Sequence, residues 1–315
     1  MDLFTKYSNI FPDVLAAQQK HAPIVALEST VFTHGLPRPQ NLDLARNMEQ
    51  TVRSEGAVPA TIAVIDGIIQ VGLNPGQMEK LAYDTNAIKV SLRDFATAIS
   101  QGLSGGTTVA GTMFAANSRN IKVFATGGIG GVHKEAELDI STDMNALATI
   151  PMLVVCAGAK SILNLPATLE YLETMGVPVV GYGTDHFPEF FSVGKDLPVS
   201  IRLDSPQEVV EFAITHWNLG MKSAVLVCQP IQDEFALDPA EIEPILALVS
   251  NEVRQKQAAH LITGQQVTPY ELMRVKDLTR GKSMRANWEL LLNNARLAAQ
   301  LARHLAGAEF LSRIT

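Results

Sequence analysis

Two charged residues that follow apolar runs could carry chemistry in this chain. Glu28 comes directly after the run IVAL, and Lys160 follows the run LVVCA and a Gly-Ala pair. In α/β folds, ligands bind at the carboxyl ends of parallel strands, where both residues are expected to lie. Desolvation there suits a carboxyl group to proton donation, and apolar surroundings suit a lysine to Schiff-base formation. Taken singly, Glu28 could equally cap a helix or form a surface ion pair, and Lys160 could reach solvent.

A glycine-rich run marks a place where an anion could be held. Gly127, Gly128, Gly130 and Gly131 surround Ile129 directly after the run VFAT. Backbone amides in such a run can converge on a phosphate group without bulk positive charge. The run is not a dinucleotide-binding fingerprint, because GGIGGVH leads into the polar stretch KEAELDISTD. A second small-residue segment, 104–112, offers further amides and hydroxyls, although a tightly packed helix start explains it as well.

An acidic cluster follows the glycine run. Asp139 and Asp143 are four residues apart, with Ser141 and Thr142 between them. A helical turn would place both carboxylates on one side, where oxygen ligands suit Mg²⁺ or Mn²⁺ and the nearby His133 favours Mn²⁺. Alternatively, Asp139 or Ser141 caps the helix that starts there.

Short apolar runs alternate with segments of helical period along most of the chain, which indicates a parallel sheet between two helical layers. The predicted strands are Ile24–Leu27, Thr61–Ile65, Ile68–Val71, a short one near Lys89–Ser91, Lys122–Ala125, Met152–Cys156, Val177–Gly181, Val199–Leu203 and Ala224–Cys228. Asp66-Gly67 predicts a tight hairpin, so the sheet should be mixed but mostly parallel. From about Pro269 the sequence is typical of helices only. We therefore expect one three-layer α/β/α catalytic domain over residues 1–315 with a C-terminal helical segment.

Local signals mark several helix ends. Ser205-Pro206 and Asp238-Pro239 each combine a capping side chain with a proline at the first helical position. Gly56 and Gly176 follow amphipathic stretches, where a left-handed stop position favours glycine.

Composition excludes several classes of protein. The chain has 315 residues, of which 47% are hydrophobic and 18% charged, so it can bury a large core. Its net charge of −7 argues against a protein bound to nucleic acid or anionic lipid by bulk charge. Cys156 and Cys228 lie in apolar runs and are expected to be reduced, buried thiols. Without a membrane-length apolar run or a signal-peptide pattern, we expect a cytoplasmic protein.

Taken together, nine sequence blocks resemble the pseudouridine-5′-phosphate glycosidase family. The blocks are ALESTVFTHG (26–35), PATIAVIDG (59–67), KVSLRD (89–94), TTVAGTM (107–113), KVFATGGIGGVH (122–133), DISTD (139–143), VVCAGAKSIL (154–163), YLETMGVPVVGYGT (171–184) and SIRLDS (200–205). They occur in the same order as in that family and span nearly the whole chain. The combination is therefore far more specific than any single block.

The resemblance implies the reversible reaction of pseudouridine 5′-phosphate with water to give uracil and ribose 5-phosphate. It also implies an α/β/α fold, a manganese ion and a homotrimer. Lys160 takes the position of the covalent lysine, Glu28 that of the proton donor and Asp139 that of the metal ligand. The implied substrate contacts are Lys89, Val109, Ser141, Thr142 and Asp143, and to these we add Gly127, Gly128 and His133 from the residue patterns above.

The substrate class itself explains why a lysine would be needed. Pseudouridine joins ribose C1′ to a carbon of uracil, which has no lone pair for an ordinary glycosidase acid to protonate. If Lys160 captures C1′ as the sugar ring opens, the resulting iminium is an electron sink, and the C–C bond can break once C5 receives a proton. Two other interpretations stay open on the residues alone. One is a Schiff-base aldolase acting on a sugar phosphate, and the other is a non-catalytic sensor of sugar phosphates or nucleotides.

Overall fold

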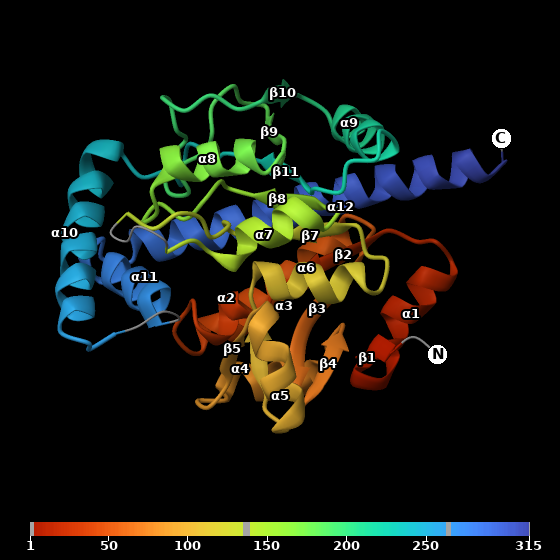
Figure 1. Cartoon of the computed structure of the whole chain (residues 1–315), viewed down its shortest axis with the longest axis horizontal. Helices are drawn as coiled ribbons and strands as arrows, with labels where there is room; N and C mark the ends of the chain where they lie inside the picture. Colours follow the sequence, from red (N-terminus) through yellow and green to blue (C-terminus); the bar gives the residue numbers. More distant parts are fainter. Residues whose placement is uncertain (1–2, 135–138, 263–265, 315) are drawn as a thin grey trace.

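A twisted sheet lies between two layers of helices in the computed structural model, which describes residues 3–134, 139–262 and 266–314 (Figure 1). The strands are β1 (Ser8–Ile10), β2 (Ile24–Leu27), β3 (Val58–Ile65), β4 (Ile68–Val71), β5 (Ile88–Val90), β6 (Gly105–Thr107), β7 (Val123–Ala125), β8 (Leu153–Cys156), β9 (Val179–Tyr182), β10 (Ile201–Leu203) and β11 (Val225–Cys228). Their order across the sheet is β1-β4-β3-β2-β7-β8-β11-β9-β10, with β6 joining β3 and β5 joining β6.

Most neighbouring strands are parallel, and the exceptions involve β3. The pairs β2–β3, β2–β7, β7–β8, β8–β11, β9–β11 and β9–β10 are all parallel. β3 pairs antiparallel with both β4 and β6. Asp66 and Gly67 join β3 to β4 with φ angles of 49° and 77°, as the turn dipeptide predicted. The mixed, mostly parallel sheet and the α/β/α layers are therefore confirmed.

The described part of the chain contains twelve α-helices. They are α1 (Pro12–Gln19), α2 (Thr30–Thr33), α3 (Gln40–Ser54), α4 (Pro75–Tyr83), α5 (Phe95–Ser100), α6 (Val109–Asn117), α7 (Thr142–Thr149), α8 (Leu165–Thr174), α9 (Pro206–Asn218), α10 (Pro239–Ala258), α11 (Val267–Leu278) and α12 (Lys282–Ile314). Two short 3₁₀ helices, η1 (Leu3–Tyr7) and η2 (Leu92–Asp94), complete the helical elements. α3 and α9 pack against the long α12, which also lies along β2, β7 and β8, whereas α6 and α7 pack together on the other face (Figure 1).

The predicted helix ends agree with the structure. The Ser205 hydroxyl accepts a hydrogen bond from the Glu208 amide at the start of α9, and the Asp238 carboxylate accepts one from the Ala240 amide at the start of α10. Gly56 and Gly176 follow α3 and α8 with φ angles of 83° and 66°. The part of the chain without strands begins earlier than expected, because α10 starts at Pro239.

The central strands of the sheet are fully buried. Every residue of β8 and β11 is fully buried, since helices cover both faces. Cys156 and Cys228 lie opposite each other on these two strands as free, buried thiols, as predicted. None of the described helices is both long and apolar enough to cross a membrane.

Candidate active site

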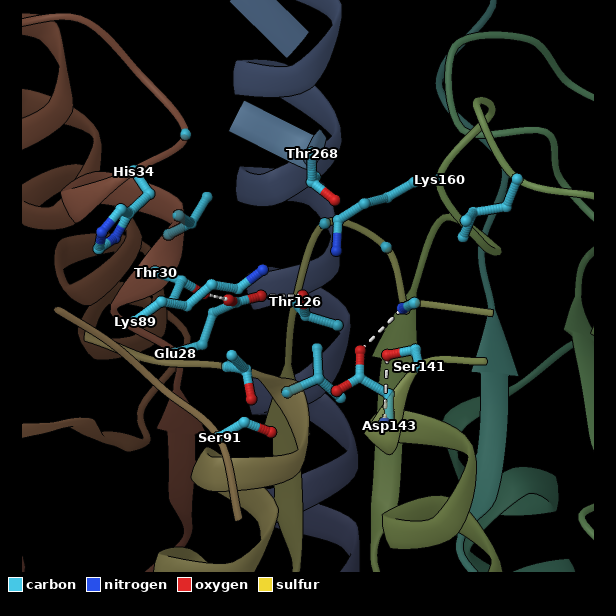
Figure 2. A pocket seen from close by; sticks show the side chains of 18 of the residues that line it. Glu28, Thr30, His34, Lys89, Ser91, Thr126, Ser141, Asp143, Lys160 and Thr268 are labelled. Carbon is cyan, nitrogen blue, oxygen red and sulfur yellow. Dashed lines mark hydrogen bonds between the residues drawn. The ribbon is translucent and has the colours of Figure 1, made fainter. Parts of the chain in front are cut away.

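The carboxyl ends of several strands enclose a pocket of ≈ 320 Å³ (Figure 2). Glu28 follows β2, Thr126 follows β7 and Lys160 follows β8, while β5 contributes Lys89. The pocket contains every residue that the sequence placed in the site, which are Glu28, Lys89, Val109, Gly127, Gly128, His133, Asp139, Ser141, Thr142, Asp143 and Lys160. The structure thus brings together side chains that are up to 132 residues apart in the sequence (160 − 28).

Glu28 is held by two threonine hydroxyls at the floor of the pocket. Its side chain is only 7% exposed. Thr30 donates a hydrogen bond to Oε2, and Thr126 donates one to Oε1. The carboxyl group is therefore fixed on both oxygens and is neither a helix cap nor part of a surface ion pair.

Two lysines reach into the pocket from opposite walls (Figure 2). Burial and then the positive charge of Lys160 lower the pKa of Lys89, against the opposing effects of Asp143, Glu28 and Asp94. The Lys160 backbone amide donates to the Ile129 carbonyl at 3.1 Å, which fixes the root of its side chain against the glycine run. Two lysine side chains that face one small cavity create an environment suited to an anionic group such as a phosphate.

Asp143 ties two segments of the pocket wall together. It is 5% exposed, and its carboxylate accepts hydrogen bonds from the Ala110 amide at 3.0 Å and the Gly130 amide at 2.8 Å. These bonds join the start of α6 to the glycine run. Both oxygens of Asp143 are thus already engaged by the backbone.

The helical turn expected to unite Asp139 and Asp143 is absent, and this prediction was wrong. α7 begins at Thr142, and Ser141 is its N-cap, whose hydroxyl accepts a hydrogen bond from the Asp143 amide at 3.2 Å. Asp139 therefore lies before the helix. The alternative in which Ser141 caps the helix is confirmed.

The glycine run serves close packing as much as ligand binding. A Cβ atom at Gly130 would lie 2.2 Å from Ser141 Oγ, and one at Gly128 would lie 2.6 Å from the Phe190 ring. The amides of Ile129 and Gly130 donate to Gly158 and Asp143 within the protein. The expectation that the whole run offers its amides to an anion is therefore too broad, because these two are engaged.

Asp139 and His133 are the residues that fit a divalent cation. Both line the pocket, and the His133 amide donates to the Asp139 carbonyl at 2.9 Å. Burial lowers the pKa of the His133 imidazole, which favours the neutral form that can bind a metal, while Asp139 opposes the shift. Among the described residues, no group of three or more His, Cys, Asp or Glu side chains could enclose a metal. The donors fit a cation that takes most of its ligands from water or substrate, as Mg²⁺ and similar ions do.

Several pocket residues escaped the sequence analysis. Thr126 and Ser91 come from strand ends, and Thr268 and Asn287 come from α11 and α12. Thr30 and His34, which follow the same apolar run as Glu28 and were expected there, also line the pocket. Thr126 directly follows β7, so the strand-end rule could have found it. Thr268 and Asn287 carry no local signal, since only the return of the C-terminal helices places them here.

Comparisons with known proteins agree with this architecture. The family model described as "Indigoidine synthase A like protein" matches residues 13–304. The pseudouridine-5′-phosphate glycosidase of Solibacter usitatus is 49% identical over 298 residues, which cover 94% of this chain and 98% of that protein. The enzyme of the same name from Geobacillus kaustophilus is 48% identical over 296 residues, or 93% of this chain and 97% of that protein.

Two solved structures share the fold. The prealnumycin C-glycosynthase AlnA, in complex with ribulose 5-phosphate, has a TM-score of 0.88 at 36% identity and covers 97% of this chain and 99% of its own. An indigoidine synthase A-like protein from Thermotoga maritima has a TM-score of 0.84 at 32% identity, with 91% and 94% covered. The chain belongs to the indigoidine synthase A-like family, together with these pseudouridine-5′-phosphate glycosidases.

Proposed function

We propose that this protein is a pseudouridine-5′-phosphate glycosidase that reversibly cleaves the C–C glycosidic bond of pseudouridine 5′-phosphate through a Schiff base on Lys160. The observation that carries the proposal is the orientation of the Lys160 amine, which points into one pocket with Glu28 and Lys89 (Figure 2). The names of relatives 48–49% identical support the reaction. The sugar phosphate bound to AlnA supports the substrate class.

The proposed reaction proceeds through a covalent bond between Lys160 and the sugar. The Lys160 amine bonds to C1′ as the bond from C1′ to the ring oxygen breaks, and Glu28 gives its proton to that oxygen. Glu28 then takes up the proton that the attached amine releases. C5 of uracil takes up a proton from water, and the amine lone pair then breaks the C1′–C5 bond, which leaves an iminium at C1′ and returns the bonding pair to the uracil ring. Water hydrolyses the iminium, which frees Lys160 and ribose 5-phosphate.

The remaining pocket residues would bind and orient the substrate. Lys89 supplies a positive charge for the phosphate, and Ser141 and Thr142 line the adjacent wall. Asp139, with His133 beside it, would hold Mn²⁺, which when bound supplies positive charge for the anionic substrate. We further propose, by analogy with the family, that the protein is a cytoplasmic homotrimer.

Uracil release tests the proposed function. The purified protein is incubated with pseudouridine 5′-phosphate and Mn²⁺, and uracil and ribose 5-phosphate are measured by chromatography. We expect both products in equal amounts from the wild type, and a loss of turnover of roughly a thousandfold or more in Lys160→Ala. Cleavage of a sugar phosphate without uracil would favour the aldolase. Binding of pseudouridine 5′-phosphate without turnover would favour the sensor.

A further inference from the structure

The hydroxyls that hold Glu28 are a different kind of partner from the amides that hold Asp143. A hydroxyl can donate a hydrogen bond and accept one, whereas a backbone amide can only donate. Thr30 and Thr126 donate to the two oxygens of Glu28, and they come from different elements, the start of α2 and the end of β7 (Figure 2). Where a carboxyl oxygen gains and loses a proton, a hydroxyl can serve as its partner in both states, whereas an amide cannot.

Thr30 has a second acceptor within reach. Its hydroxyl lies 3.2 Å from the carbonyl oxygen of Thr107, in addition to its contact with Glu28. Because a hydroxyl carries one proton, it donates to one of these acceptors at a time. The Thr30 proton can therefore turn from Glu28 to Thr107, which leaves a lone pair of the same oxygen facing Glu28.

Thr126 lacks this freedom. In the ranges that the structure describes, Glu28 is the only hydrogen-bond partner of its hydroxyl. Its peptide is fixed on both sides, since its amide donates to the Val155 carbonyl at 3.0 Å and its carbonyl accepts from the Asn294 side chain on α12 at 2.9 Å. Thr126 is the rigid partner of Glu28, and Thr30 is the adjustable one.

We propose that Thr30 is a positioning residue that lets Glu28 exchange a proton, while Thr126 fixes the carboxyl plane in both protonation states. With Glu28 ionised, both threonines donate to it. With the proton on Oε2, Glu28 donates to Thr30, and Thr30 donates to the Thr107 carbonyl. The threonine proton stays on its own oxygen throughout. The inference rests on the proposed function, in which Glu28 gives a proton to the ring oxygen and regains one from the Lys160 amine.

Because the threonine hydroxyls are buried, the loss of either one leaves Glu28 with an unsatisfied oxygen. Glu28 is 7% exposed, Thr30 9% and Thr126 0%, so only a small part of each residue borders the pocket. A buried polar atom that loses its partner keeps its full desolvation cost. Thr30→Val keeps nearly the same shape but leaves Oε2 without a donor in one state and without an acceptor in the other.

The test introduces Thr30→Val and Thr30→Ser, each into the wild-type protein and into the Glu28→Gln variant. For every variant, kcat, KM and the pH profile of kcat are measured. We expect Thr30→Val to lower kcat by about tenfold to a hundredfold with little change in KM, and to move the limb of the pH profile that Glu28→Gln abolishes. Thr30→Ser should restore most of kcat, since it keeps the hydroxyl. In Glu28→Gln, Thr30→Val should cause no further loss.

Thr61→Val is the matched control. Thr61 donates to the carboxylate of Glu49 at 2.7 Å, a part-buried threonine–glutamate pair outside the pocket, so its loss should leave kcat unchanged. Thr30→Ala serves if Thr30→Val does not fold. An equal loss in the Glu28→Gln background, no rescue by serine, or a change confined to KM would overturn the inference while uracil release by the wild type stands. No uracil from the wild type would refute the proposed function, and the inference with it.

Discussion

Glu28 and Asp143 are two buried carboxylates of one pocket with different partners. Glu28 is bound by two threonine side chains, and Asp143 is bound by two backbone amides. The amides belong to segments that Asp143 joins, namely the start of α6 and the glycine run. Of the two hydroxyls, that of Thr30 has a second acceptor within reach, the Thr107 carbonyl, and can change from donor to acceptor toward Glu28. In the proposed reaction, the type of hydrogen-bond partner, and not burial, distinguishes Glu28 as a proton carrier from Asp143, which joins two backbone segments.

Glu28→Gln should have the largest effect on turnover. The amide cannot pass a proton, so we expect kcat to fall by roughly a hundredfold to ten-thousandfold, while ribose 5-phosphate binds with nearly unchanged affinity. Steady-state kinetics and calorimetric titration with ribose 5-phosphate measure the two quantities. An unchanged kcat would make Glu28 part of the scaffold.

Asp143→Asn should act on stability instead. The asparagine amide would place a donor against one of the two backbone amides, and a buried hydrogen bond to a charged group would be lost. We expect the free energy of unfolding to fall by about 3 kcal/mol, as measured by urea denaturation. If stability stays at the wild-type value and kcat alone collapses, the assignment of Asp143 as a clamp is wrong.

Glu271 on α11 offers a third carboxyl group with a smaller expected effect. It is 4% exposed, and its Oε2 atom has no hydrogen-bond partner among the described residues. Burial raises its pKa from 4.5 to about 8, although Lys134 and Lys160 oppose the shift and Asp139 adds to it. Between these two pKa values the folded protein binds more protons than the unfolded chain, so this group's contribution to stability falls as pH rises.

Glu271→Gln removes this titration, since the amide is neutral at every pH. We expect the variant to be close to the wild type in stability near pH 4.5 and to become increasingly more stable than the wild type as pH rises toward 8. Urea denaturation of both proteins at a series of pH values measures the difference. A difference that does not grow with pH would show that Glu271 is not held in its neutral form.

Sequence patterns predicted the parts of the site that depend on strand ends. Glu28 and Lys160 follow short, wholly apolar runs, which are typical of strands that helices cover on both faces. The strand β6 could not be predicted, because Gly105-Gly106-Thr107 has no apolar pattern. It forms where β3 and β5 pair with it, and a Cβ atom at Gly105 would lie 2.3 Å from the Ile88 carbonyl.

Sequence spacing could not predict the loop geometry or the contacts of the C-terminal helices with the pocket. A separation of four residues suggested a helical turn from Asp139 to Asp143, but the serine cap at 141 starts the helix after Asp139. Thr268 and Asn287 reach the pocket only because α11 and α12 fold back toward the strand ends. Such contacts depend on tertiary packing rather than on local periodicity.

Borohydride trapping tests the central claim, which is that the Lys160 amine bonds covalently to the sugar. Borohydride is added during turnover of pseudouridine 5′-phosphate, and the modified peptide is located by mass spectrometry. We predict a reduced adduct of ribose 5-phosphate on Lys160, and none in Lys160→Ala. Uracil release without an adduct, or an adduct on Lys89 instead, would contradict the account.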